Sequence, residues 1–293
     1  MRQRRVLPCR ILDEGRVLAI LKDLRESREL LYNLTMREIK GKYKRTALGQ
    51  LWSLANPLAL MVVYSFVFRF IIRVQPAAGD PSGLDVFALW LMCGLLPWSF
   101  FTNVVSGGMG VLVGNENLIK KVYFPRSALL VSNSLSWLYS WSIEMLVLVV
   151  AVILLGGAPY LYVVPTLAVM LLLTLFSTGV AMAMSIANVH FRDTQYLMGI
   201  VFQIWFYANP IVYPATMVES VSAGVEEFYG ISLFDVYRAN PFYYFIEAFR
   251  NLLYDNRMPD VTTWVVLVLL SLLCFLVGWR LFESRQDSLA EVL

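Results

Sequence analysis

Six long apolar runs constrain the fold of this chain more than any other feature of its sequence. They cover residues 51–74, 87–113, 127–155, 161–187, 196–212 and 263–282. About 20 apolar residues in a helix cross the hydrocarbon core of a bilayer. In lipid, only helices and closed barrels satisfy their backbone hydrogen bonds, and runs of this length are typical of helices. The sequence therefore predicts an all-α integral membrane protein with six transmembrane helices.

The composition agrees with a membrane environment. Hydrophobic residues make up 58% of the 293 positions, charged residues only 15%, and the mean hydropathy is +0.63. Soluble domains carry about 25% charged residues. A single soluble core could not bury so much apolar surface, so lipid must cover part of it.

Charge divides the chain into three parts. Residues 51–282 hold the apolar runs, residues 1–50 are rich in charge, and residues 283–293 form a short tail. The first part has no apolar stretch of signal-peptide length, so we expect no secretory signal before the first span. Lys and Arg near span ends stay in the cytoplasm. Because 19 of the 24 basic residues fall on one side of the predicted topology, both termini are expected in the cytoplasm.

A basic strip at residues 37–45 directly precedes the first apolar run. One interpretation is an anchor that only orients the chain. The other is a docking platform for a partner, because an amphipathic pattern precedes the strip. The spacing predicts helices with apolar faces formed by Val17, Ile20, Leu21 and Leu24, and then by Leu31 and Leu34.

Several kinds of site are disfavoured by residue counts. Cys9, Cys93 and Cys274 are scattered, which argues against a disulfide framework and a thiolate metal site. His190 is the only histidine, which excludes a multi-histidine metal centre. No GxxxxGK[ST] phosphate loop occurs, so ATP should not bind by that route. We expect neither a metal nor a cofactor in this chain.

Short motifs along nearly the whole chain resemble those of ABC-2 type permease subunits, most closely the group that exports lipid-linked polysaccharides such as O-antigen, teichoic acid or cell-wall galactan. The motifs are REIK at 37–40, YKRT at 43–46, LGQLW at 48–52, NPL at 56–58, NLIKKVYFPR at 117–126, FRD at 191–193, NPIVYP at 209–214, NP at 240–241 and IEAFR at 246–250. Asn209 departs from the family, in which Ser is more frequent at this position. This departure weakens any inference about substrate at that turn.

The resemblance implies a permease subunit that has no ATP site of its own. Such a subunit forms a homodimer in the cytoplasmic (inner) membrane and binds two copies of a separate ATPase, which carries the ATP and Mg. A lipid-linked polysaccharide would then cross through a pore at the homodimer interface. The resemblance also implies that the amphipathic segment before the first span contacts the ATPase.

Two short inner loops, residues 115–126 and 188–196, are candidates for contact with the ATPase because they are charged and compact. Without the resemblance, ordinary solvated turns would be the favoured interpretation. The candidate coupling residues are Arg37, Lys40, Glu116, Lys120, Lys121, His190, Phe191, Arg192 and Asp193.

Polar and aromatic stripes mark the interior of the spans. Aromatic faces stack on sugar rings, but aromatic residues also form interfacial belts and pack cores. Glu144 continues a serine stripe at i+4 steps from Ser132, which indicates either a polar path or close helix packing, and packing is favoured. The candidate substrate-pathway residues are Tyr64, Phe68, Glu144, Gln203, Trp205, Phe206 and Tyr207.

The outer side also offers candidates. Arg69 lies 18 residues into the first run, or about 27 Å along a helix, near the outer edge of the core. Asn240 is positioned to cap a short helix, which we expect to be re-entrant or to lie on the surface. The candidate outer-pore residues are Arg69, Arg73, Phe242, Phe245 and Phe249.

Two other functions compete with export. The first is a polytopic membrane enzyme that acts on polyprenyl-linked sugars, but the outer acids Glu219, Glu226, Glu227 and Asp235 show no metal-binding spacing. The second is a passive channel, which the elaborate inner loops disfavour. The sequence does not identify the polymer or its lipid carrier.

Overall fold

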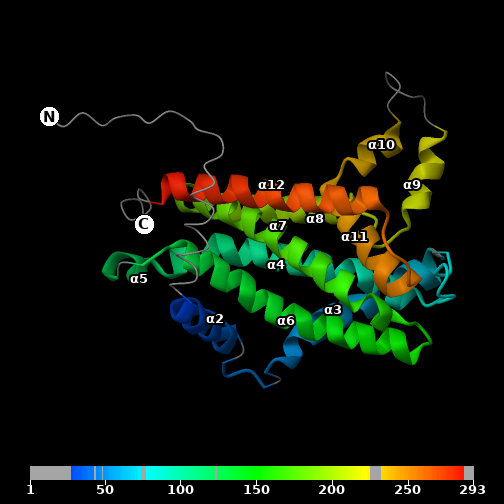
Figure 1. The fold of residues 1–293 in the computed structure, drawn as a ribbon, viewed down its shortest axis with the longest axis horizontal. Helices are drawn as coiled ribbons and strands as arrows, with labels where there is room; N and C mark the ends of the chain where they lie inside the picture. Colours follow the sequence, from blue (N-terminus) through cyan, green and yellow to red (C-terminus); the bar gives the residue numbers. More distant parts are fainter. Residues whose placement is uncertain are drawn as a thin grey trace.

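The computed structural model describes residues 28–42, 44–47, 49–73, 77–122, 124–224 and 232–286. All regular secondary structure within these ranges is helical, which confirms the predicted all-α fold. The long helices run side by side along one axis (Figure 1). The amphipathic pattern predicted at residues 17–24 and most of the tail at 283–293 lie outside the described residues.

Within this part of the chain, five helical segments are long and apolar enough to cross a membrane. The first combines α3 (Leu51–Tyr64) with the π-helical turn η1 (Ser65–Ile71). The fourth combines the short 3-10 turn η2 (Pro159–Tyr162) with α7 (Val163–His190). The other three segments are the single helices α4 (Phe87–Gly114), α6 (Ser127–Leu154) and α12 (Val261–Arg285).

The fifth predicted span, residues 196–212, is not confirmed. In its place α8 (Thr194–Tyr207) has 14 residues, which corresponds to about 21 Å and falls short of a 30 Å core. Irregular chain follows as far as Pro214. The physical reason is the proline at position 210, because a residue before proline is biased away from the helical conformation.

The core is centred on α4. Inside the bundle, 78% of the most apolar part of α4 is buried, compared with 6% for the segment of α3 and η1. Helix α4 packs against α6 and α7, and α7 packs against α12. The first span is therefore peripheral, and most of its surface is left for lipid or for another chain.

Two glycines bring α7 and α12 into backbone contact. A Cβ on Gly179 would lie 2.6 Å from the Cα of Phe275, and a Cβ on Gly278 would lie 2.9 Å from the Cα of Gly179. Both distances are shorter than any van der Waals contact. Small residues allow such an approach between membrane helices.

Short helices occupy the two ends of the bundle (Figure 1). One end has α9 (Ala215–Ser222), α10 (Leu233–Arg238), α11 (Pro241–Arg250) and the π-helical turn η3 (Asn251–Asp255). The other end has α2 (Arg28–Lys42), which packs on α6, and α5 (Glu116–Lys121), which follows α4. Helix α11 enters the bundle instead of lying on its surface, because its apolar face is fully buried.

Candidate functional site

A cavity of about 350 Å³ opens between α3, α4 and α8. Its wall on α3 consists of Asn56, Leu60 and Tyr64, which the i+4 spacing places on one helix face. The wall on α8 repeats this pattern with two interleaved pairs. These pairs are Phe202 with Phe206, and Gln203 with Tyr207.

Aromatic rings form the inner side of this cavity. Tyr64 stacks on Phe206 with the ring centroids 5.6 Å apart. Trp98 of α4 meets Phe206 at 6.2 Å and Phe202 edge-on at 6.3 Å. The rings are therefore held in place by neighbours from three helices. Such a wall presents fixed aromatic surfaces of the kind that bind the apolar faces of small molecules.

Polar groups share the cavity with these rings. The amides come from Asn56, Gln203 and Asn103, and the hydroxyls from Ser99 and Thr102. The Thr102 hydroxyl donates to the Trp98 carbonyl at 3.1 Å, so it is tied to its own helix. The combination of ring faces with amides and hydroxyls suits a ligand that carries both apolar faces and hydroxyl groups.

The sequence-based prediction of a substrate pathway names four residues that the structure brings together here, namely Tyr64, Gln203, Phe206 and Tyr207. Phe68 contacts Tyr64 at 6.2 Å but does not line the cavity. The contribution of α4 was missed. The sequence did contain a signal for it, because Ser99 with Asn103, and Trp98 with Thr102, have the same i+4 spacing and so lie on one face of α4.

Trp205 points away from the cavity toward a network that joins the two Asn-Pro motifs. The Trp205 indole N–H donates to Oδ1 of Asn240 at 3.0 Å. The Nδ2 group of Asn240 donates to Oδ1 of Asn209 at 2.8 Å, and Nδ2 of Asn209 donates to the Trp205 carbonyl at 2.6 Å. The end of α8 is thereby fastened to the start of α11.

Glu144 lies on α6, apart from this cavity, and is half-buried. The serines that precede it at i+4 steps are buried. The Ser132 and Ser136 hydroxyls donate to carbonyls of α6 itself, at 2.9 Å and 2.8 Å. This arrangement is the one expected of a helix face that packs closely, and a path through it stays a prediction.

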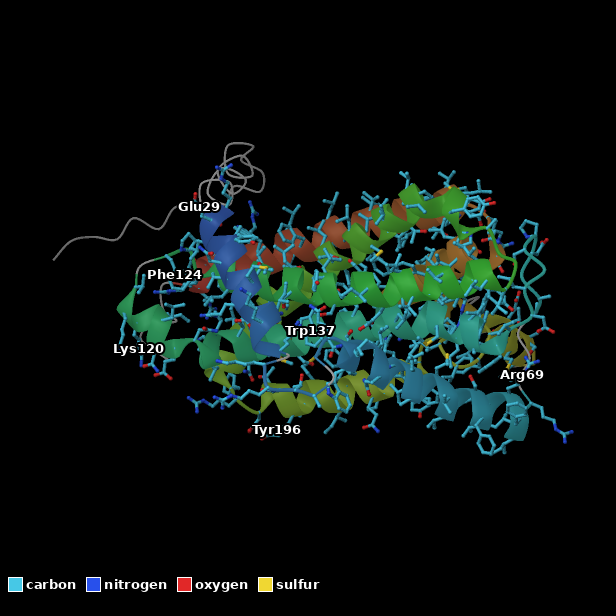
Figure 2. The ribbon with its side chains drawn as sticks, turned by 90° about the horizontal axis from the view of Figure 1, so that it is seen from below. Glu29, Arg69, Lys120, Phe124, Trp137 and Tyr196 are labelled. Atoms are coloured by element: carbon cyan, nitrogen blue, oxygen red, sulfur yellow. The ribbon has the colours of Figure 1, made fainter. Side chains whose placement is uncertain are left out.

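The predicted coupling residues gather at one end of the bundle. Figure 2 shows Lys120, Tyr196 and Glu29 near this end and Arg69 at the opposite one. The Lys120 Nζ group donates a hydrogen bond to Oε1 of Glu116 at 2.7 Å and holds the pKa of this carboxyl below its usual range. The positive charge of Arg192 lowers the same pKa by a smaller amount. The two inner loops are therefore close enough to interact electrostatically.

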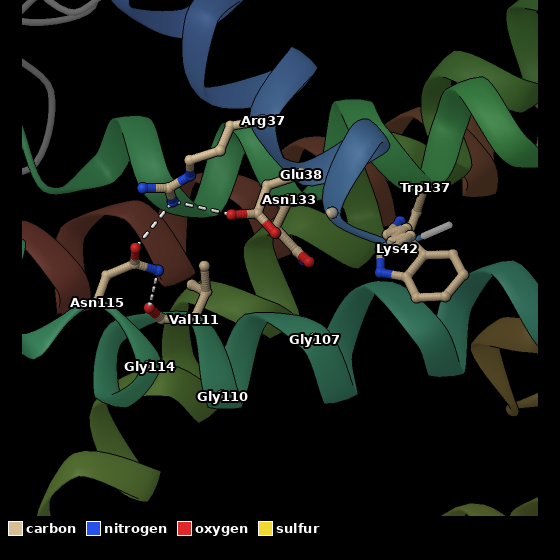
Figure 3. A pocket seen from close by; sticks show the side chains of 11 residues that line it. Arg37, Glu38, Lys42, Gly107, Gly110, Val111, Gly114, Asn115, Asn133 and Trp137 are labelled. Atoms are coloured by element: carbon tan, nitrogen blue, oxygen red, sulfur yellow. Dashed lines mark hydrogen bonds and ion pairs between the residues drawn. The ribbon is translucent and has the colours of Figure 1, made fainter. Parts of the chain in front are cut away.

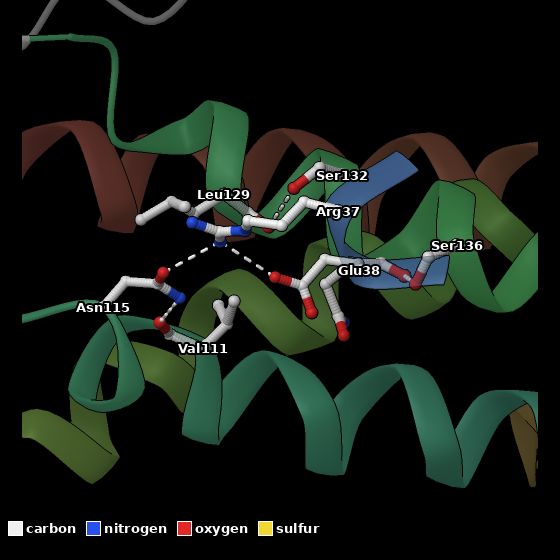
Figure 4. A network of polar contacts seen from close by, with 8 residues as sticks. Arg37, Glu38, Val111, Asn115, Leu129, Ser132 and Ser136 are labelled. Carbon is white, nitrogen blue, oxygen red and sulfur yellow. Dashed lines mark hydrogen bonds and ion pairs between the residues drawn. The ribbon is translucent and has the colours of Figure 1, made fainter. Parts of the chain in front are cut away.

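Arg37 connects α2 to the turn before α5. Its Nη2 group donates to Oδ1 of Asn115 at 2.8 Å and to Glu38 at 2.9 Å (Figure 4). Asn115 in turn donates to the Val111 carbonyl of α4 at 2.8 Å. Sequence reasoning did not single out Asn115, although it ends α4 and begins the next helix.

The second inner loop is exposed. The Phe191 ring is 74% accessible, and Arg192 and Asp193 are exposed beside it. The imidazole Nδ1 of His190 lies 2.9 Å from the Ile186 carbonyl. Lys40 and Lys121 are also exposed. Contact of these residues with an ATPase stays a prediction.

The predicted outer-pore residues fall into two groups. Arg69 is half-buried, and Arg73 is exposed near the end of the first span. Three rings of α11 are fully buried and pack the core of this single chain, so contact with a substrate would require α11 to move. These rings belong to Phe242, Phe245 and Phe249.

The outer acids do not form a metal site in the described part of the chain. Ser232 caps α10 and exchanges hydrogen bonds with Asp235 in a capping box. The Ser232 hydroxyl, 2.8 Å from the Asp235 carboxylate, is the main reason that the pKa of Asp235 is lowered. Glu219 is exposed. Glu226 and Glu227 lie outside the described residues.

Comparison with known proteins identifies relatives over almost the whole chain. The family model described as "ABC-2 type transporter" matches residues 29–254. The O-antigen export system permease protein of Myxococcus xanthus is 28% identical over 275 residues, which cover 94% of this chain and 99% of the relative. A protein of the same description from Klebsiella pneumoniae is 28% identical over 90% of this chain and 95% of the relative. The polysialic acid transport protein of Escherichia coli is 20% identical over 87% of this chain and 93% of the relative.

Proposed function

The chain belongs to the ABC-2 type transporter family, and we propose that it is the permease subunit of an ATP-driven exporter of a polysaccharide. The relatives support this proposal, because their descriptions name export of O-antigen and transport of polysialic acid. The single observation that carries it within this chain is the cavity between α3, α4 and α8, which combines aromatic rings with amides and hydroxyls.

We further propose that the polysaccharide is lipid-linked and crosses at the interface of a homodimer. The first span supports this arrangement, because little of its surface is buried within one chain. Helix α8, which forms one wall of the cavity, also carries the exposed apolar residues Ile200 and Ile204. A second copy facing this side would close the cavity into a path between two chains.

The proposed topology has six spans in the cytoplasmic (inner) membrane, with both termini in the cytoplasm. Helix α8 and the irregular chain after it together form the fifth crossing. Irregular backbone at membrane depth is tolerated where protein covers it. Asn209, Ile211 and Val212 satisfy this condition, because they are fully buried.

In this proposal a separate ATPase, present in two copies, binds ATP and Mg and contacts the end formed by α2, α5 and the loop at 188–196. Support comes from the missing phosphate loop and from the charged, exposed side chains at this end. Phe191 is the natural anchor, because exposed aromatic rings surrounded by polar residues are typical of interface contacts.

The purified chain alone should not hydrolyse ATP, and it should form a stable complex with a separate ATPase. Phe191→Ala should uncouple hydrolysis from export while protein abundance stays near normal, because its ring packs on little within this chain. The matched control is Tyr160→Ala, which removes an exposed ring before α7, at the opposite end of that helix. ATP hydrolysis by the isolated chain, after contamination controls, would contradict the assignment as a permease subunit.

A further inference from the structure

A second cavity, of about 530 Å³, lies between α2, α4 and α6 (Figure 3). Arg37 and Lys42 face it from α2, and Asn133 and Trp137 face it from α6. Gly110 lines it on α4, where an added Cβ would meet nothing within 4 Å. The cavity is therefore open down to the α4 backbone. Its volume is in the range of small-molecule sites.

The amine of Lys42 is the most unusual group in this cavity. Its Nζ atom is buried and lies 3.3 Å from the centre of the Trp137 ring. Among the described residues it meets no hydrogen-bond acceptor. An ammonium group has three N–H donors, and a buried donor without a partner costs free energy. A ligand that supplies oxygen atoms would remove this cost.

Arg37 provides a second positive group at the same cavity. Its Nη2 group is engaged by Asn115 and Glu38, whereas a guanidinium has five N–H donors in all. The charged residues that line the cavity are two cations and one carboxylate, Glu38. The lining is therefore net positive and rich in donors, which favours an anion.

The depth of the cavity indicates which anion. Helix α6 has 28 residues, or about 42 Å, which exceeds a 30 Å hydrocarbon core by about 6 Å at each end if the helix is centred. Asn133 is the seventh residue of α6, about 9 Å from its start. The cavity therefore lies near the boundary between the hydrocarbon core and the lipid phosphates, a level at which tryptophan is enriched.

We propose that this cavity binds a phosphate ester, with Lys42 as the anchoring cation. Lysine binds phosphate as a compact point charge, and here its orientation is fixed by Trp137. A membrane lipid head group and a soluble ester both present the same phosphate oxygens to the amine, so either source fits the site. This site is separate from the proposed polysaccharide path, and its test does not depend on export.

The binding should depend on pH. Burial lowers the pKa of Lys42 to about 7. The carboxylates of Glu38 on the same helix and Glu144 on α6 act in the opposite direction and raise this pKa. The α4 residues that line the cavity carry no charge. A bound phosphate stabilises the protonated amine, so binding takes up a proton. The affinity should therefore fall as the pH rises above about 7.

The test is a calorimetric titration of the purified full-length chain, stripped of lipid in a neutral detergent. The first probe is dihexanoyl-phosphatidylglycerol, and the second is dihexanoylglycerol, which has the same acyl chains without phosphate. Wild type should bind only the phosphate lipid saturably. Lys42→Met should weaken that binding about tenfold or more, as expected when charge-assisted hydrogen bonds are lost. Lys42→Arg should retain most of it, and the exposed Lys44→Met is the matched control.

Gly110→Leu fills the cavity without removing a charge and should also abolish binding. This second variant keeps the test valid if Lys42→Met fails to fold. Competition by inorganic phosphate would assign the site to a soluble ester, whereas its failure to compete would assign the site to lipid. Either result upholds a phosphate site. Equal binding of the two lipids, or binding that is unchanged in both folded Lys42→Met and Gly110→Leu, would overturn it.

Discussion

At the scale of single residues, the two Asn-Pro motifs meet through side chains that are far apart in the sequence. Asn240 both caps α11 and holds the end of α8, because its amide group contacts Asn209, Trp205 and the Phe242 N–H. Asn209, where Ser is the more frequent residue of the resembled family, is thus a partner in a structural network. The motifs were visible in the sequence, but their contact was not, because it depends on how α11 enters the bundle.

Asn240→Ala should lower the free energy of unfolding by about 2–4 kcal/mol, since it removes a helix cap and leaves buried donors without partners. Asn33→Ala, at an exposed position of α2, is the control and should have little effect. Thermal unfolding of the detergent-solubilised variants measures the difference. Similar melting temperatures for both variants would show that the network contributes little.

A buried acid makes stability depend on pH at the outer end. Burial raises the pKa of the Asp255 carboxyl to about 6, although the Arg257 guanidinium lies 3.4 Å away and lowers it. Because the folded pKa exceeds the unfolded one, this group stabilises the fold at low pH. That contribution is lost as the pH rises through about 6.

Asp255→Asn should therefore melt at a higher temperature than wild type above pH 7 and should show a weaker loss of stability between about pH 4 and 7. Asp85→Asn, at an exposed carboxyl on a neighbouring loop, is the control. Melting curves across this pH range test the sign. A variant less stable than wild type at neutral pH would contradict the account.

At the scale of elements, hydropathy located the long spans but not the end of α8. The predicted and observed bounds of α4 and α6 agree within one residue, since apolar runs of that length leave little freedom. The run at residues 196–212 is shorter, and the proline at position 210 ends its helix early. For α11 the sequence left a re-entrant and a surface position open, because an apolar helix face has the same pattern on a surface as in a core.

Backbone contact between α7 and α12 predicts a strong effect of adding one methyl group. Gly179→Ala and Gly278→Ala should each reduce the yield of folded protein, because the nearest atoms are backbone and have no room to move. Gly199→Ala on α8 is the matched control, since a Cβ there meets nothing within 4 Å. Size-exclusion profiles of the three variants measure the effect. Normal profiles for both test variants would show that the helices separate easily.

At the scale of the whole molecule, the proposed function assigns its two tasks to separate parts of the chain. The end formed by α2, α5 and the loop at 188–196 presents charged and exposed groups, whereas the cavity opens between α3, α4 and α8 along the side of the bundle. The sequence predicted four of the residues that line this cavity, Tyr64, Gln203, Phe206 and Tyr207. It missed the α4 residues of the cavity, because their polar pairs are embedded in a helix that is otherwise core.

The central claim is that a polysaccharide passes the cavity between α3, α4 and α8 during ATP-driven export. A photo-crosslinking amino acid at Gln203, which lines this cavity and is exposed, tests it in exporting cells. Glycan should become attached to the chain at this position, and only when the partner ATPase is active. The same crosslinker at Tyr160, outside the cavity, should capture none. Equal labelling at both positions, or none at Gln203 while export proceeds, would contradict the account.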